Sequence, residues 1–222
     1  MVEYGFYNWT SKVRLYAKFS KKELIWILVS IAVMTFILGF DDGNSEFNLA
    51  GYSVNMLWGL IAVTVAVFMH ESAHRLMAPN LGYKVEFKPV FFGLLGGLIL
   101  SFMSYGKIVF LAYSTFVLDM KEKHRLGYFR HYLGYFDNGK VAIVGPLANL
   151  LAAFAFRAMD FLPDALVAKL VFVNALFVIF NMLPIPPLDG SHVMYATRTF
   201  SPIIGGTMIG AAGFMLIPQL TW

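Results

Sequence analysis

Two histidines and a glutamate stand in the short sequence HESAH, residues 70–74, directly after a long apolar run. His70 and His74 are four residues apart, so on a helix both imidazoles lie on one face about one turn apart, the spacing that two ligands of one zinc ion need. Glu71 follows the first of them and can act on a water at the metal without binding the metal. The spacing indicates a hydrolytic zinc site with His70 and His74 as ligands and Glu71 as general base.

Two non-functional explanations exist for the HESAH sequence. It occurs by chance in roughly one chain in a hundred of this length, and buried histidines are often only hydrogen-bonded core residues. The composition weakens both, because 59% of the 222 residues are hydrophobic and 14% are charged, and the mean hydropathy is +0.67, as in a polytopic membrane protein. A carboxylate inside a membrane span costs at least a few kcal/mol unless it is compensated, and a divalent cation would compensate it.

Five apolar segments approach the length needed to cross about 30 Å of hydrocarbon. They are residues 23–40, 54–78, 140–156, 165–183 and 203–220. Residues 81–118 carry β-branched and aromatic residues typical of strands on either side of GLLGGLILSFM, whose glycines permit tight turns or close packing. We interpret this region as a re-entrant hairpin, with one more helical hairpin as the alternative.

The fold class that these segments predict is mainly α, a polytopic transmembrane helix bundle of about five or six spans with a small membrane-associated β region. No linker, repeat or low-complexity tract divides the chain. We therefore expect a single domain, residues 1–222. The absence of cysteine excludes disulfides, thiolate zinc sites and cysteine nucleophiles.

The distribution of lysine and arginine predicts the orientation in the membrane. The segment before the first span is basic and the connector 41–53 has no lysine or arginine, so the N-terminus is expected in the cytoplasm. HESAH and the later sequence LDG then lie toward the cytoplasmic ends of inward-running helices, which places the mouth of the site on that side. The basic segment 119–139 is more typical of contact with lipid headgroups than with nucleic acid, and no nucleic-acid partner is expected.

A catalytic zinc ion keeps three protein ligands and one open position. Asp189 is the best candidate for the third ligand, because the prolines of NMLPIPPLDG end a helix and the irregular backbone from about residue 183 can turn a carboxylate toward HESAH. A solvated turn aspartate is the alternative, and His192 is a competing ligand. Asp189 leaves a net charge of +1 to be buried, and a third imidazole would leave +2. Asn174 and Asn181 share a helix face, where they either join helices by hydrogen bonds or, for Asn181, face the metal.

Three of these sequences resemble the signatures of the site-2 protease family of intramembrane zinc metalloproteases. They are HESAH in one span, GPLAN (145–149) in a later span and NMLPIPPLDG (181–190) in the next. The resemblance implies one zinc ion per chain bound by His70, His74 and Asp189. It also implies Glu71 as the general base and Asn181 on the substrate side of the active site, with a membrane-associated β region after the second span. Ser72 and Ala73 depart from the commoner Leu-Gly, and segment 119–139 has no equivalent in the family.

The function that the resemblance implies is that of a zinc-dependent intramembrane metalloendopeptidase. It would hydrolyse peptide bonds within or near the transmembrane helices of membrane-protein substrates, as in regulated intramembrane proteolysis, with such a substrate and the lipid bilayer as partners. The alternative is a non-catalytic membrane protein that binds or transports metal. A transporter would need further acidic or histidine residues spread through the spans, and the chain has essentially one cluster.

Overall fold

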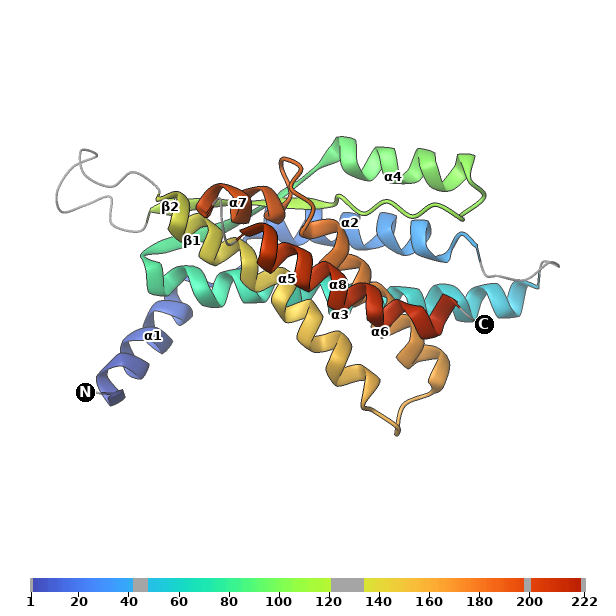
Figure 1. Cartoon of the computed structure of the whole chain (residues 1–222), viewed down its shortest axis with the longest axis horizontal. Coiled ribbons are helices and arrows are strands. Elements are labelled where there is room, and N and C mark those ends of the chain that lie inside the picture. Colours follow the sequence, from blue (N-terminus) through green and yellow to red (C-terminus); the bar gives the residue numbers. More distant parts are fainter. Residues whose placement is uncertain (1, 42–47, 121–133, 198–200, 221–222) are drawn as a thin grey trace.

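The computed structural model describes residues 2–41, 48–120, 134–197 and 201–220, and the described chain is mainly helical with one two-stranded antiparallel sheet. The elements in chain order are α1 (Val2–Tyr16), α2 (Lys21–Gly39), α3 (Leu49–Met77), a 3₁₀ helix η1 (Ala78–Leu81), β1 (Tyr83–Pro89), α4 (Phe91–Met103), β2 (Ser114–Met120), α5 (Tyr135–Arg157), α6 (Asp164–Asn181), α7 (Asp189–Ala196) and α8 (Ser201–Leu220). The sheet and α7 lie at one end of the bundle, and α4 lies along one side of it (Figure 1). The predicted fold class is confirmed.

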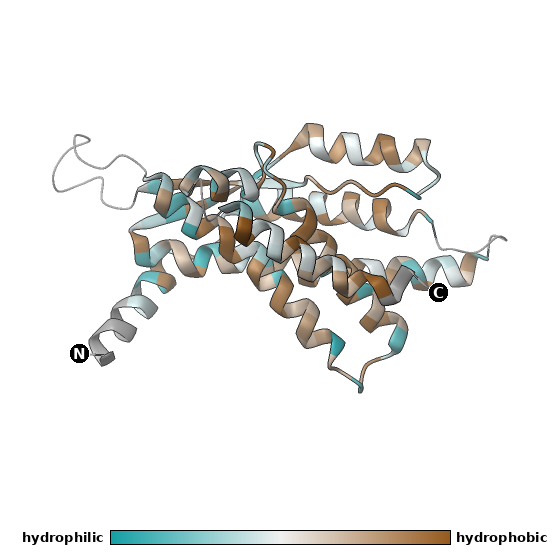
Figure 2. Ribbon diagram, in the orientation of Figure 1, coloured by the Kyte–Doolittle hydropathy of each residue, from teal (hydrophilic) through white to brown (hydrophobic). Residues whose placement is uncertain are grey.

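Four helical segments of the described chain are long and apolar enough to cross a membrane. They are α2, α3 with η1, α5 and α6, and Figure 2 shows hydrophobic residues along α2, α4, α5 and α6. The fifth predicted span, 203–220, falls within α8, whose apolar part Ser201–Ile217 is shorter. The chain is therefore a multi-pass membrane protein whose span count is close to the expected one.

The first turn of α2 is fixed by a capping box. The backbone N–H of Glu23 donates to Oγ of Ser20 over 3.2 Å, and the backbone N–H of Ser20 donates to Oε2 of Glu23 over 2.6 Å. This reciprocal pair satisfies amides that the start of a helix leaves without partners. Glu23 is buried, so the box also directs a carboxylate into the bundle.

Small side chains set the packing of α3 against its neighbours. Ala62, Val63, Ala66 and Val67 are completely buried, and α3 packs on α2, α5 and α6. Small residues at such positions let helix backbones approach closely within a membrane, where the hydrophobic effect between helices is absent. The C-terminal half of α3 is thus enclosed by other helices, and the HESAH sequence lies in this half.

Polar contacts tie the helices at both ends of the bundle. At one end the Arg75 guanidinium on α3 contacts the Glu23 carboxylate on α2 over 2.7 Å. At the other end Nζ of Lys169 on α6 donates to Oδ1 of Asn55 on α3 over 2.8 Å. The first contact shows that α2 and α3 run in opposite directions, and the second shows that α3 and α6 run in the same direction. This agrees with the alternation that the sequence predicted, and the end with Arg75 is also the end with the sheet.

Residues 81–118 form a mixture of the two expected arrangements. β1 pairs with β2 in an antiparallel register that sets Val85 opposite Leu118, so strands at both ends of the region are confirmed. The stretch GLLGGLILSFM between them is the helix α4 rather than a tight turn. After it the chain returns along α4 as an extended segment, residues 107–113 (Figure 1), and β2 begins later than the strand-like sequence suggested.

Of the two roles expected for the glycines in this region, close packing is the one that the structure shows. A Cβ atom on Gly97 would lie 2.6 Å from the carbonyl oxygen of Phe110, and one on Gly93 would lie still closer to that of Ala112. The extended segment therefore lies directly against the glycine face of α4. A helix followed by its own extended return is a small unit that does not need to cross the membrane.

Candidate metal centre

His70 and His74 occupy the last two turns of α3, and Asp189 is the first residue of α7. At 1.5 Å per residue the two histidines lie roughly 5 to 10 Å before the end of α3. Helix α6 ends at Asn181, and the turn 182–188 that follows directs the first residue of α7 back into the bundle. The irregular backbone expected after residue 183 is confirmed, and the structure brings the three side chains together in a buried position.

The three ligand atoms are spaced as the ligands of one small ion would be. The Nε2 atoms of His70 and His74 are 3.1 Å apart, and Oδ2 of Asp189 lies 3.0 Å from the first and 3.3 Å from the second. Nitrogen and oxygen ligands placed about 2.0–2.1 Å from a tetrahedral zinc ion lie about 3.3 Å from one another. The observed triangle matches that spacing.

Hydrogen bonds at the far side of each imidazole fix which nitrogen carries the proton. Nδ1 of His70 lies 2.7 Å from Oδ1 of Asn149, and the Asn149 amide nitrogen is itself a donor to Ala66 and Asn174, so the asparagine oxygen must accept. Nδ1 of His74 lies 2.7 Å from the carbonyl oxygen of Val141, which can only accept. Both Nδ1 atoms are therefore protonated, and in the neutral imidazoles both Nε2 lone pairs point at the same place.

Oδ2 of Asp189 completes this convergence of lone pairs. It is buried and has no hydrogen-bond donor, a costly state for a carboxylate oxygen. Three electron-rich atoms aimed at one point are unfavourable without a cation between them, so these residues fit a divalent metal ion.

The buried charges of the described chain lead to the same conclusion. Four side chains that carry a formal charge at neutral pH are buried, namely Glu23, Glu71, Arg75 and Asp189. Three carboxylates and one guanidinium leave a net charge of −2 among residues surrounded by apolar helices. Burying uncompensated charge is strongly unfavourable, and one divalent cation brings the total to zero.

Glu71 is held by groups from three parts of the chain. Its Oε2 accepts from Nη1 of Arg75 over 2.9 Å. Its Oε1 accepts from Oγ of Ser114 over 3.1 Å and, more weakly, from the Tyr113 hydroxyl over 3.4 Å. Neither oxygen of Glu71 belongs to the three-atom cluster, so the structure does not group Glu71 with the candidate ligands.

Gly145, the first residue of GPLAN, leaves the space in which the two imidazoles meet. A Cβ atom there would lie 2.8 Å from Cε1 of His70 and still closer to Nε2 of His74. Only a residue without a side chain lets α5 pass this close to the cluster. The last residue of the same sequence, Asn149, orients His70, so GPLAN acts on the site through its first and its last residue.

His192 lies outside the cluster. Its ring packs against Phe116, which in turn packs against His74 with ring centroids 5.2 and 4.8 Å apart. Nδ1 of His192 accepts from the Asn138 amide over 3.0 Å, and burial lowers the pKa of His192. Between the two candidates for the third ligand, the structure brings Asp189 to the histidines and leaves His192 on the other side of Phe116.

A cavity of about 440 Å³ opens beside this aromatic wall. Its lining comes from β2, the start of α5, the proline turn and α7: Thr115, Phe116, Val117, Tyr135, Asn138, Pro186, Pro187, Ser191, His192 and Tyr195. Aromatic and proline side chains with a few polar groups are typical of sites that bind ligands. The cavity adjoins the histidines through Phe116.

Asn181 is buried near the end of α6, where its amide donates to the carbonyl of Phe177 over 2.9 Å. Within the described chain no hydrogen bond joins it to the cluster, so its role on the substrate side remains a prediction. Asn174, one of the two asparagines that share this helix face, instead accepts from Asn149 and joins α6 to α5. Hydrogen bonding between helices is thus the role that the structure gives to Asn174.

Comparison with known proteins gives one relative. No protein-family model and no solved structure matches the chain. A protein of Methanocaldococcus jannaschii named "Putative zinc metalloprotease" is 32% identical to it over 205 residues, which are 90% of this chain and 97% of the relative. The similarity therefore spans nearly the whole of both chains, including the region that carries the cluster.

Proposed function

The chain belongs to the same zinc metalloprotease family as this archaeal protein, and on that premise we propose that it is an intramembrane metalloendopeptidase of the site-2 protease type. It hydrolyses peptide bonds within or beside the transmembrane helices of membrane-protein substrates. The observation that carries this proposal is the meeting of His70, His74 and Asp189 next to Glu71 inside a bundle of apolar helices. A protease built in this way acts on chains that the bilayer presents to it.

His70, His74 and Asp189 would hold one zinc ion through Nε2, Nε2 and Oδ2. When bound, zinc supplies Lewis-acid chemistry, which polarises a carbonyl and makes water a better nucleophile near neutral pH. Asn149 and Val141 keep both imidazoles in the tautomer that offers Nε2. Hydrogen bonds of this kind to metal-binding histidines orient the ligand and raise its basicity.

Glu71 acts as general base and then as general acid. It takes one proton from the attacking water while the water oxygen bonds to the scissile carbonyl carbon. It then gives this proton to the amide nitrogen as the C–N bond breaks. The products are a carboxylic acid and an amine, so that one water is consumed and Glu71 returns to its starting state.

We also propose that the N-terminus and the mouth of the site face the cytoplasm. The basic segment before α2 supports this orientation, and the contact between Arg75 and Glu23 puts the sheet and the metal centre at that same end. Substrates whose helices unwind easily near this side would be favoured, because a helix keeps its amides out of reach. Asn181 is a candidate to hydrogen-bond such an unwound segment.

A metal transporter is the other class considered, and the described residues do not favour it. They contain one group of histidine and acidic side chains that could hold a metal. The partly buried cation at the other end of the bundle, Lys169, bonds to Asn55 and would repel a metal cation that passes through. An ion path needs several sites in sequence, and the described structure offers one.

The experiment that tests the proposal compares wild type with Glu71→Gln in detergent or vesicles. Wild type is expected to hold one zinc ion per chain and to cleave a model transmembrane substrate. Glu71→Gln should keep the zinc, since Glu71 is not a ligand, and should lose cleavage by about 100-fold or more because the proton acceptor is gone. Cleavage at the wild-type rate by Glu71→Gln would refute Glu71 as the base, and loss of zinc from a folded variant would make it a ligand instead.

A further inference from the structure

Arg75 and Glu23 are two buried charged residues for which the proposed reaction gives no role. We propose that together they form a positioning device for Glu71, in which Arg75 holds the general base and Glu23 on α2 holds Arg75. This inference rests on the proposed function, because it concerns how the base of that reaction is kept in place. It assigns the last residue of the sequence HESAHR and the first turn of α2 to the catalytic apparatus.

The contact between Arg75 and Glu71 is short and buried. Nη1 of Arg75 donates both to Oε2 of Glu71 over 2.9 Å and to the backbone carbonyl of Glu71 over 3.1 Å. The two residues are four apart on α3, so the helix itself sets them side by side. One guanidinium nitrogen of Arg75 thus donates to both the side chain and the backbone of Glu71.

The other terminal nitrogen of Arg75 is committed to Glu23. Nη2 donates to Oε1 of Glu23 over 2.7 Å, and the same oxygen accepts from the backbone N–H of Phe87 on β1 over 2.8 Å. Oε2 of Glu23 accepts from the backbone of Ser20 at the start of α2. Glu23 is therefore fixed by the cap of its own helix and by β1, and the contact with Arg75 joins α2, α3 and β1 at one carboxylate.

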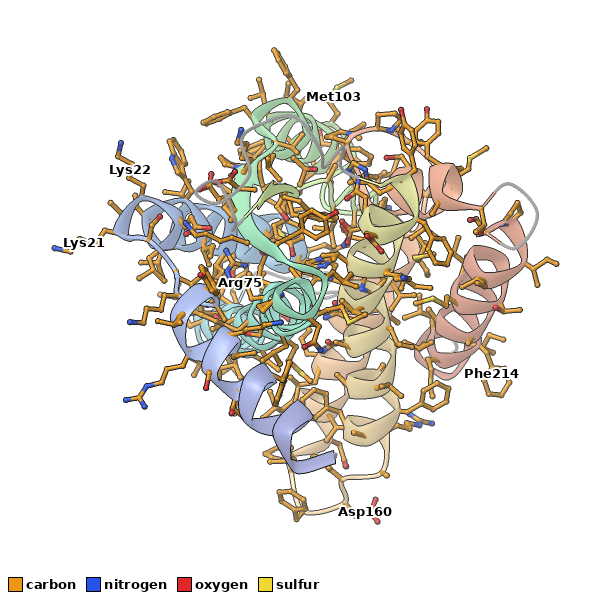
Figure 3. The ribbon with its side chains drawn as sticks, turned by 90° about the vertical axis from the view of Figure 1, so that its left-hand side faces the viewer. Lys21, Lys22, Arg75, Met103, Asp160 and Phe214 are labelled. Carbon is orange, nitrogen blue, oxygen red and sulfur yellow. The ribbon has the colours of Figure 1, made fainter. Side chains whose placement is uncertain are left out.

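One further contact restricts the Arg75 guanidinium. The Arg75 guanidinium carbon lies 3.9 Å from the centre of the Phe19 ring, a cation–π contact that fixes the plane of the fork. Figure 3 shows Arg75 in the interior of the molecule, while Lys21 and Lys22 at the start of α2 point outward. Two neighbouring lysines thus reach the surface, and Arg75 alone of these cations is enclosed.

Catalysis depends on the direction in which the Glu71 carboxylate faces the attacking water. A carboxylate offers about four lone-pair positions. Arg75 takes one on Oε2, and Ser114 and, over a longer distance, Tyr113 contact Oε1, so the plane of the carboxylate is set and a position on Oε2 remains for the water. Displacing a catalytic group by about 1 Å can cost about 100-fold in rate. A freely rotating glutamate would lose this alignment without any change in the metal ligands.

Arg75 could have a simpler role, which is to neutralise Glu23 and thereby stabilise the fold. The test must distinguish this role from the positioning of Glu71. The double variant Arg75→Met/Glu23→Gln distinguishes the two, because it removes one positive and one negative charge together. Arg75→Met alone leaves Glu23 and Glu71 without their cation and should lower the Tm clearly. In the double variant the Glu23 charge is gone, so most of the lost Tm should return.

The expected result is that cleavage does not return with the Tm. Arg75→Met and the double variant should both keep one zinc ion per chain and a KM within about twofold of wild type, while kcat falls about 10- to 100-fold. Arg75→Lys, which keeps the charge but loses the fork, should give an intermediate kcat. Lys169→Met is the control, since it removes a partly buried cation at the opposite end of the bundle and should leave kcat unchanged.

Three outcomes would overturn the proposal. A wild-type kcat in Arg75→Met shows that the base needs no positioning by Arg75. Recovery of kcat together with the Tm in the double variant shows that Arg75 only neutralises Glu23. A double variant that regains no Tm shows that the two residues do not share their charge. The Tm measurement uses no substrate. It therefore tests the contact between Arg75 and Glu23 even if wild type fails to cleave, a result that would refute the proposed function.

Discussion

Oδ1 of Asn149 on α5 accepts a hydrogen bond from Nδ1 of His70 on α3 over 2.7 Å. The asparagine is fixed in turn by its amide nitrogen, which donates to the Ala66 carbonyl on α3 and to Asn174 on α6. Three helices therefore meet at one amide group. The orientation of the first candidate ligand is set by residues far from it in the sequence.

Replacing Asn149 should weaken zinc binding without removing a ligand. Asn149→Leu keeps the volume but leaves Nδ1 of His70 without an acceptor, so the imidazole can turn and change tautomer. Loss of such a supporting bond typically costs about 10- to 100-fold in metal affinity, which competition with a chelator would measure. Asn55→Leu makes the same chemical change at the other end of the bundle and should keep the wild-type affinity. Equal affinities for the two variants would show that the bond to His70 is unimportant.

Adding one methyl group at Gly145 should also weaken zinc binding. The new Cβ of Gly145→Ala would press on both imidazoles, and overpacking of this kind costs about 1–3 kcal/mol, equivalent to about 5- to 150-fold in zinc affinity. The measurement is zinc content after dialysis against a weak chelator. Gly206→Ala is the control, because a Cβ there meets no atom within 4 Å. If Gly145→Ala retains as much zinc as the control, the close approach of Gly145 to the two imidazoles is contradicted.

The third ligand can be identified by metal content alone. Asp189→Ala should lose most of its zinc, because it removes the only carboxylate in the cluster. His192→Ala should keep its zinc, since His192 lies behind Phe116 and bonds to Asn138. The Tm of each variant is measured together with its zinc content, so that loss of zinc can be distinguished from loss of folding. The reverse pattern would make His192 the ligand and would contradict the cluster.

Cysteine labelling tests the orientation in the membrane. The chain has no native cysteine, and Lys21 and Asp160 both reach the surface (Figure 3). In sealed, right-side-out cells, a membrane-impermeant thiol reagent should label Asp160→Cys and should reach Lys21→Cys only after lysis. Labelling in the opposite sense would reverse the orientation and leave the chemistry of the site untouched.

The part of the site that the sequence predicted is the part governed by local rules. His70, Glu71 and His74 lie on one helix, where spacing alone puts the two imidazoles on a common face. Asp189 could be found because prolines end α6 and free the backbone that carries it. The roles of Glu71 as base and Asn181 as substrate contact stay predictions.

The supporting residues were missed because their contacts join distant segments. GPLAN was noted as a motif, but only the packing of α5 on α3 shows why Gly145 and Asn149 are needed. The sequence around Arg75 does not indicate that its guanidinium pairs with a residue of α2. A capping-box pattern at Ser20 and Glu23 was readable in the sequence, and it signals the start of α2, but not that its carboxylate turns inward to Arg75.

Residues 91–103 show a different limit. Phenylalanine, leucine and glycine carry no decisive preference between helix and strand, and a short apolar run cannot be assigned by periodicity alone. The helix α4 forms because its glycine face accepts the extended segment 107–113, a contact between two stretches of similar composition. Pairing of that kind is a tertiary effect, which composition does not encode.

The distance along the chain between the ligands has a consequence for biosynthesis. His74 and Asp189 are separated by two of the membrane-crossing helices, α5 and α6. At translation rates of about 5–20 residues per second, roughly 6 to 23 s pass between the synthesis of the histidines and that of the aspartate. A nascent chain during this interval has a base and two imidazoles but no complete centre. In the proposed mechanism the nascent chain therefore cannot hydrolyse a peptide bond until Asp189 has been added.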